Sequence, residues 1–299
     1  MKTKIGLALG GGGARGLAHL GVLKVLEEDG IPIDSITGTS MGAVVGAMYA
    51  QNPDSESIIK RFENFLASQD YDLLGLKYVI PQDEQNPSFL SHLVQIVAKR
   101  IVVNFAPTRT GIIKTERLSD AISFLIDDGD FHDTKIPFGA VTTDLNSGET
   151  VLFRKGNIKK AVTLSSSIPG YISPEPVNGN LFTDGGVSAP VPVYEAREMG
   201  ADLVIGICVG VNQIKALENP NIIDIISRTD AIKGIYLSKL QLSNADVSLH
   251  PDVKDAHWSE FLRYKEFVNA GIVEAQKKLP EIHNAIRKKK NLIRKIFRF

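Results

Sequence analysis

The sequence predicts an α/β fold in which a central, mainly parallel sheet is flanked by helices on both faces, giving three α/β/α layers. Short apolar runs alternate along the chain with stretches whose apolar residues recur at helical spacing. Such alternation is typical of a parallel sheet, because each parallel strand needs a crossover to reach the next. The 299 residues are 43% hydrophobic and 23% charged, a globular composition that provides for a sizeable core.

The first elements follow one another closely. Residues 5–9 form a continuous apolar run, the pattern of a strand buried on both faces. Four glycines at 10–13 come next, and apolar spacing then predicts a helix over residues 17–26. A second short strand is predicted at 35–37 and a buried helix at 43–50. The chain therefore begins with two strand–turn–helix units.

The middle of the chain, residues 52–130, is less regular. Helical pieces alternate there with polar breaks such as residues 81–87. Thr115 is expected to cap a helix that runs to about residue 127. We interpret 52–130 as a helical insertion near the functional site.

Alternation resumes beyond residue 136. Asn157 is expected to cap a helix, Asn178-Gly179 is a hairpin signal, and Gly200 is expected to end a helix. The elements predicted here are strands at 137–143, 150–154 and 203–209, helices at 157–166 and 193–199, and helix from 222 onward, with a short apolar run at 247–249. We find no internal repeat and no clean linker, so we expect a single domain over residues 1–299.

Composition excludes several classes of protein. Lys and Arg number 34, as do Asp and Glu, which argues against a dedicated nucleic-acid binder, since those usually have a basic domain. The single cysteine, Cys208, allows no intrachain disulfide. No apolar run approaches the ~20 residues that span a bilayer, and the N-terminal one is too short for a signal peptide. We therefore expect a cytoplasmic protein, with no metal site and no cofactor.

Gly38-Thr39-Ser40-Met41-Gly42 is the first candidate for chemistry. This G-x-S-x-G pattern lies between a predicted strand and a predicted helix, as a nucleophile elbow requires. The two flanking glycines, Gly38 and Gly42, would leave room for a strained Ser40 whose hydroxyl lies at a helix N-terminus. The alternative is an ordinary glycine-flanked turn in which the serine only caps the helix.

The glycine-rich loop Gly10-Gly11-Gly12-Gly13-Ala14-Arg15-Gly16 is the second candidate. Backbone N–H groups of such a loop can bind an anion, so it could form an oxyanion hole facing Ser40. A dinucleotide site is the alternative reading, since Gly11–Gly16 fits G-x-G-x-x-G, but no acidic residue ends the second predicted strand. A tight turn without chemistry is the third reading.

Asp184-Gly185-Gly186 is the third candidate. A carboxylate at a strand end, followed by two glycines, can approach another loop closely and deprotonate a serine hydroxyl. Alone, the motif is most often a simple turn.

Taken together in this order, the three motifs make the chain resemble the patatin-like phospholipases. Within that family, the chain resembles in particular the bacterial branch that is related to neuropathy-target-esterase-type lysophospholipases. The resemblance runs from about residue 4 to residue 209 and includes Thr143-Asp144-Leu145 and a further block at 161–174 with Ser165-Ser166-Ser167-Ile168-Pro169. The catalytic positions of the family's motifs are all present.

This resemblance implies a serine lipid acyl hydrolase with a Ser–Asp dyad and a lipid ester as substrate. Ser40 would be the nucleophile and Asp184 its base. The N–H groups of Gly11, Gly12 and Gly13 would hold the oxyanion, with Met41 N–H as an additional donor. The supporting motif positions are Arg15, which would fix the loop or meet a substrate phosphate, and Gly16, Gly38, Gly42, Gly185 and Gly186.

Three competing readings stay open, and one of them is the dinucleotide-binding oxidoreductase built on Gly11–Gly16. His250 and His257 follow Asp184 in the Ser–Asp–His order of α/β-hydrolases, so a triad competes with the dyad. A catalytically silent adaptor that binds lipid or protein on the same fold competes with an enzyme, although an intact Ser40 and Asp184 argue against it.

The last thirteen residues form a basic amphipathic tail. Residues 287–299 contain seven Lys and Arg and no acid, so the rest of the chain has a net charge of −7. One helical face gathers the apolar residues Ile286, Leu292, Ile293, Ile296 and Phe297. This combination suits peripheral contact with an anionic membrane, and a helix packed on the domain is the alternative.

Overall fold

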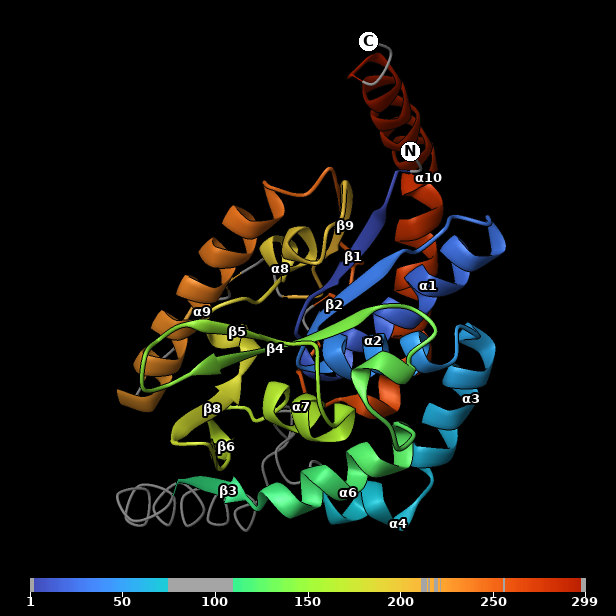
Figure 1. The fold of residues 1–299 in the computed structure, drawn as a ribbon. Coiled ribbons are helices and arrows are strands. Elements are labelled where there is room, and N and C mark those ends of the chain that lie inside the picture. The colour runs from blue at the N-terminus through green and yellow to red at the C-terminus, as the bar shows by residue number, and fades with distance from the viewer. Residues whose placement is uncertain are drawn as a thin grey trace.

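A computed structural model of the protein describes residues 3–74, 110–210, 214, 216, 217, 220, 222–254 and 256–296. Within these residues, eight strands form one central sheet (Figure 1). In chain order they are β1 (Ile5–Leu9), β2 (Ser35–Thr39), β4 (Phe138–Asp144), β5 (Thr150–Phe153), β7 (Glu175–Val177), β8 (Asn180–Asp184), β9 (Leu203–Ile207) and β10 (Val247–Leu249).

The sheet combines a parallel half with an antiparallel half. Strands β10, β9, β1, β2 and β4 are neighbours in that order and run parallel. Strands β5 and β8 both pair antiparallel with β4, and β7 pairs antiparallel with β8. Because β1 and β2 are parallel and Leu9 pairs with Gly38, the turns that follow these two strands lie side by side.

Helices cover both faces of this sheet. The described helices are α1 (Ala18–Glu28), α2 (Met41–Gln51), α3 (Ser55–Leu66), α4 (Gln69–Leu73), α6 (Thr115–Leu125), α7 (Ile158–Ser165), α8 (Val193–Glu198), α9 (Ile222–Leu242) and α10 (Tyr264–Ile296). Figure 1 shows α1, α2 and α10 on one face and α8 and α9 on the other. The three-layer α/β/α class predicted from the sequence is thereby confirmed.

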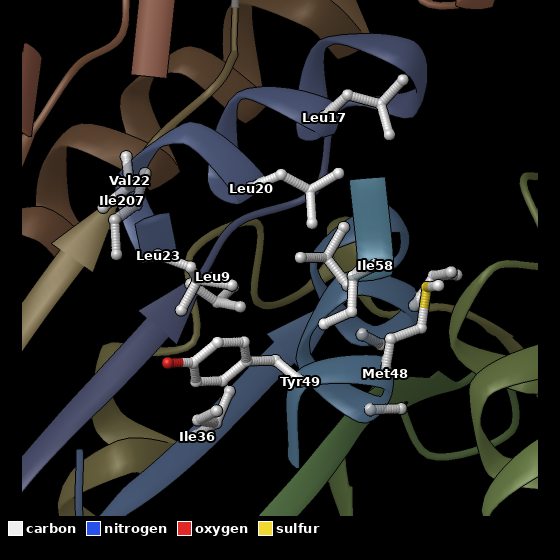
Figure 2. Packing of buried hydrophobic residues seen from close by; sticks show 14 of the residues in the cluster. Leu9, Leu17, Leu20, Val22, Leu23, Ile36, Met48, Tyr49, Ile58 and Ile207 are labelled. Carbon is white, nitrogen blue, oxygen red and sulfur yellow. The ribbon is translucent and has the colours of Figure 1, made fainter. Parts of the chain in front are cut away.

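The parallel strands read as continuous apolar runs because both of their faces are buried. In β1, Leu7 and Leu9 belong to the large core cluster, whereas Ala8, between them, belongs to a second cluster with Val193 of α8. Figure 2 shows the large cluster, in which Leu9 packs with Leu23 of α1. Burying a side chain of this size stabilises the fold by about 1.5–3 kcal/mol.

The first and last helices cross at two glycines. A Cβ atom added at Gly21 of α1 would collide with the Val268 carbonyl oxygen, and one at Gly271 of α10 would collide with the Ala18 carbonyl oxygen. Only glycine allows the two helix backbones to approach this closely. The end of α10 beyond this crossing projects away from the body (Figure 1).

Most turn and cap residues lie where the sequence predicts them. Asn157 caps α7 by accepting the Lys160 N–H, and Asn178 and Gly179 both have positive φ in the hairpin between β7 and β8. The cap expected at Thr115 is wrong by one residue. Lys114 is the N-cap of α6, because the Thr115 hydroxyl instead donates to the Ser173 carbonyl.

A second, two-stranded sheet lies under the main one. It pairs β3 (Gly111–Ile113) in parallel with β6 (Gly170–Ile172). Together with α3, α4 and α6 it belongs to the lower part of the molecule in Figure 1. Residues 75–109 of the predicted 52–130 insertion lie outside the described residues.

Candidate active site

Ser40 occupies a strained turn between β2 and α2. Its φ of 54° and ψ of −124° are unusual for a residue with a side chain, and such strain clusters at functional sites. A Cβ at Gly42 would collide with the Leu9 carbonyl oxygen, and one at Gly38 would collide with the Gly42 carbonyl oxygen. The two glycines of the G-x-S-x-G pattern are therefore required by the packing of this turn.

The strained turn opens directly into helix α2. The Ser40 carbonyl accepts hydrogen bonds from the N–H groups of Ala43 and Val44, so Ser40 is the N-cap residue. Its side chain is consequently at the positive end of an eleven-residue helix, where developing negative charge is favoured. Ser40 is 7% exposed.

Asp184 lies at the end of β8 and is 6% exposed. Burial raises the pKa of its carboxyl group from the ordinary 3.8 to about 6, against the Ser40 hydroxyl and the Gly186 N–H, which both favour the ionised form. Oδ1 accepts the Gly186 N–H at 2.7 Å. Oδ2 has no hydrogen bond in the described part of the chain. The contact of the carboxyl group with Ser40 is therefore looser than an ordinary hydrogen bond, as is common before substrate binds.

The glycine loop follows β1 and lies against the Ser40 turn. A Cβ at Gly11 would lie 3.3 Å from the Cβ of Ser40. The Gly11 N–H donates to the Pro190 carbonyl at 3.0 Å, so in this structure it is not available to an oxyanion. Among the described residues, the N–H groups of Gly12 and Gly13 have no acceptor. These two groups remain open at the site.

Arg15 and Gly16 hold the loop in shape. The Arg15 Nε donates to the Gly12 carbonyl at 3.1 Å, and burial lowers the pKa of the guanidinium. A Cβ at Gly16 would overlap the Met41 side chain, so Gly16 allows the loop to pack on α2. Gly13 has a positive φ of 56° and touches the backbone of Trp258.

The Asp184-Gly185-Gly186 turn is equally crowded. A Cβ at Gly185 would collide with the Val141 carbonyl oxygen, and one at Gly186 would lie 3.0 Å from Oδ1 of Asp184. The two glycines therefore let the turn sit directly on strand β4 while the Gly186 N–H reaches the carboxylate.

An apolar pocket of about 750 Å³, counting the open space at its mouth, adjoins this constellation. Ser40, Met41 and Gly13 form part of its wall, and helices α3 and α6 contribute Phe62 and Leu125. The C-terminal segment contributes further aromatic side chains, Trp258 and Phe261, and Trp258 stacks edge-on with Tyr171.

Sequence reasoning gave no role to three groups near the site. His19 is fully buried, and burial lowers its pKa to about 4, so a neutral ring donates from Nε2 to the Gly10 carbonyl at 2.8 Å. Ser165 accepts the Ser40 N–H. Trp258 forms pocket wall. Ser165 lies in a stretch that the family resemblance includes, but no local motif marks His19 or Trp258. Helical spacing from the glycine loop places His19 in the first turn of α1.

The two histidines that could complete a triad make contacts with other residues. The His250 backbone N–H donates to Glu274, and the His257 ring bonds the Ser259 hydroxyl at 2.8 Å. In both, burial lowers the pKa of the imidazole. The groups that act on the Asp184 carboxyl are Ser40 and Gly186. In the part of the chain that is described, no three His, Cys, Asp or Glu side chains gather as a metal site would require.

Comparisons with known proteins place the chain in a family. A sequence model described as patatin-like phospholipase matches residues 7–197. An uncharacterized NTE family protein of Mycobacterium bovis is 32% identical over 207 residues, covering 68% of this chain and 48% of that protein. Patatin-like phospholipase domain-containing protein 7 of Rattus norvegicus is 32% identical over 238 residues, covering 78% of this chain and 15% of that protein.

The chain thus spans about half the length of the mycobacterial relative and a much smaller part of the rat one. Among solved structures, VipD from Legionella pneumophila aligns over 92% of this chain and 66% of its own, at 15% identity and a TM-score of 0.42. The family model covers well over half of the sequence and includes all three motifs. The chain belongs to the patatin-like phospholipase family.

Proposed function

We propose that the protein is a lipid acyl hydrolase that cleaves carboxylic esters through a Ser40–Asp184 dyad. The observation that carries this proposal is the strained Ser40 turn, which is buried beside the Asp184 carboxyl and opens into an apolar pocket. Family membership supports the same reaction class.

The reaction would proceed in two steps. Ser40 Oγ attacks the ester carbonyl carbon while its proton passes to Asp184 Oδ2, and the protonated carboxyl then gives this proton to the departing alcohol. Water, deprotonated by Asp184, next attacks the acyl-enzyme, and the proton returns to Ser40 as the carboxylic acid leaves. The N–H groups of Gly12, Gly13 and Met41 would stabilise the oxyanion of each tetrahedral intermediate.

The pocket supports an acyl chain as the part of the substrate that is recognised. Its described walls are almost wholly apolar, with the Ser40 hydroxyl group at the reacting end. Burial of each methylene contributes about 0.8 kcal/mol, so such a pocket favours long acyl chains over short ones. We therefore propose phospholipid or lysophospholipid esters as the substrate class.

The end of α10 supports contact with an anionic membrane surface. Arg287, Lys288 and Lys290 are exposed there, Leu292 is 53% exposed, and no acidic residue follows Glu281. Each basic group near an anionic surface contributes about 1 kcal/mol. No described helix has the length and apolar character needed to pass through a bilayer, so the contact would be peripheral.

Labelling with a fluorophosphonate probe tests the dyad. We expect the wild-type protein to be labelled, and Ser40→Ala and Asp184→Asn to lose labelling while remaining folded by circular dichroism. Labelling of the Ser40→Ala variant would show that another residue is the nucleophile. A folded wild-type protein that resists the probe and hydrolyses no lipid ester would instead favour the adaptor reading.

Deletion of residues 287–299 tests the membrane contact separately. We expect weaker sedimentation with phosphatidylglycerol-containing vesicles and unchanged hydrolysis of a soluble ester, because the described part of this segment, 287–296, is the end of α10 that projects away from the body (Figure 1). Equal vesicle binding by the truncated and full-length proteins would end this part of the proposal.

A further inference from the structure

Three consecutive serines, Ser165 to Ser167, lie between the two halves of the proposed dyad. We call this segment the serine bridge. It begins at the last residue of α7, and both Ser165 and Ser167 are completely buried. The bridge contacts Ser40 through a side chain and Asp184 through a backbone carbonyl.

The contact to Ser40 is made by the Ser165 hydroxyl. The Ser40 N–H donates to Ser165 Oγ at 3.0 Å, and Oγ in turn donates to the Val141 carbonyl at 2.6 Å. Because Ser40 is the N-cap of α2, its N–H has no partner within the helix. A buried N–H needs a partner, and a residue 125 positions away supplies it.

The contact to Asp184 is made by the last residue of the bridge. The Ser167 carbonyl accepts the Asp184 N–H at 3.0 Å and the Thr183 hydroxyl at 2.8 Å. Val141, which accepts from Ser165, lies in β4, and the next residue of that strand, Thr142, pairs with Asp184. Ser165 therefore joins the Ser40 turn to β4, the strand that pairs with Asp184 in β8, and it begins the segment whose Ser167 carbonyl holds the Asp184 N–H.

We propose that Ser165 is a positioning residue for ester hydrolysis, whose hydroxyl holds the strained Ser40 backbone at a fixed place relative to Asp184. This inference rests on the proposed dyad. Ser165 has no exposed surface, so it cannot touch a substrate and acts only through Ser40. Strained backbone persists where the surroundings over-determine it, and this hydrogen bond supplies part of that restraint.

The test compares two matched substitutions, Ser165→Ala and Ser167→Ala. Both remove one fully buried hydroxyl, but the Ser167 hydroxyl donates only to the Thr163 carbonyl of α7, at 2.8 Å. For Ser165→Ala we expect kcat for a soluble p-nitrophenyl ester to fall about 10- to 100-fold, because small displacements of a reacting group cost this much. Ser167→Ala keeps the backbone carbonyl that accepts the Asp184 N–H, so for this variant we expect a clearly smaller fall in kcat.

Two further readouts separate positioning from general destabilisation. Trp258, the sole tryptophan, lines the pocket, so its fluorescence should report equal binding of decanoate by wild type and Ser165→Ala. The acidic limb of the rate profile should also move to higher pH in Ser165→Ala, because the Ser40 hydroxyl helps to keep Asp184 ionised. A purely structural loss would lower the amount of active enzyme without moving the acidic limb.

A near-isosteric variant covers the case in which Ser165→Ala does not fold. Ser165→Cys keeps a weak donor and acceptor at the same place, and its kcat should lie between those of wild type and Ser165→Ala. A folded Ser165→Ala or Ser165→Cys protein with wild-type kcat would overturn the inference, as would equal losses in the Ser165 and Ser167 variants. Ser40→Ala is assayed in parallel. If this variant kept its activity, the dyad itself would be refuted, rather than the role of Ser165.

Discussion

Asp184 makes the protein less stable in the pH range where it would work as a base. Its folded-state pKa of about 6 exceeds the ordinary 3.8 because the carboxyl group is buried. Between these two values the folded state holds more protons than the unfolded state, so the free energy of unfolding falls as the pH rises. The amide side chain of Asp184→Asn cannot ionise, so the free energy of unfolding of this variant should not fall in this way as the pH rises.

The size of the effect follows from the two pKa values. Their separation corresponds to about 3 kcal/mol, at ~1.4 kcal/mol for each pH unit. About 1 kcal/mol of this is lost by pH 4.5 and nearly all of it by pH 8. The stability of Asp184→Asn relative to wild type should therefore increase by about 2 kcal/mol between pH 4.5 and pH 8.

Urea unfolding followed by circular dichroism measures this change. We compare the stability of Asp184→Asn relative to wild type at the two pH values. Any cost of the buried amide that does not depend on pH then cancels. Ser167→Ala, which alters no titratable group, is the control, and its stability relative to wild type should not vary with pH. An Asp184→Asn advantage that is the same at both pH values, or that shrinks toward pH 8, would refute a raised pKa at Asp184.

The remaining predictions concern activity and packing. In the wild type, kcat/KM for a soluble ester should fall about tenfold from pH 7 to pH 5, because Asp184 titrates near 6 and must be ionised to act as base; a flat profile over this range would contradict that role. Gly42→Ala should lower the free energy of unfolding by at least about 1–3 kcal/mol, because the new methyl group meets the Leu9 carbonyl. The control Gly234→Ala, in open space within α9, should instead stabilise by about 1 kcal/mol, and urea unfolding compares the two. Val44→Phe, one helical turn after Ser40 in the pocket wall, should lower the dodecanoate-to-butyrate ester preference about tenfold, since lost apolar contacts are worth ~1–3 kcal/mol; an unchanged preference would place the acyl chain elsewhere.

Elements specified by neighbouring residues were predictable from the sequence. The apolar run of β1, the turn at Ser40 and the hairpin at Asn178 are local patterns, and the structure has all three. The placement of Asp184 beside Ser40 came only from resemblance to a family, because no local pattern encodes a contact between residues so far apart. The sheet that joins β2, β4 and β8 brings them together.

Other features of the site depend on packing that the sequence does not display. The Gly11 N–H is taken by Pro190, and the hydroxyl of Ser165 reaches Ser40, through contacts between distant segments. Trp258 reaches the pocket because its loop packs on the glycine loop, where its carbonyl accepts the Ala14 N–H. None of these partners follows from helical or strand spacing.

The place of β1 in the sheet has a consequence for biosynthesis. This N-terminal strand lies between β2 and the late strand β9, and the Gly10 N–H is held by the Ile207 carbonyl. Helix α1, which follows β1, likewise packs against α10 at Gly271. A nascent chain can therefore pair β1 with β2 early, but we expect its glycine loop to stay unanchored until Ile207 has left the ribosome. Hydrolytic competence would then require synthesis beyond Ile207, so shorter nascent chains would not attack lipid esters.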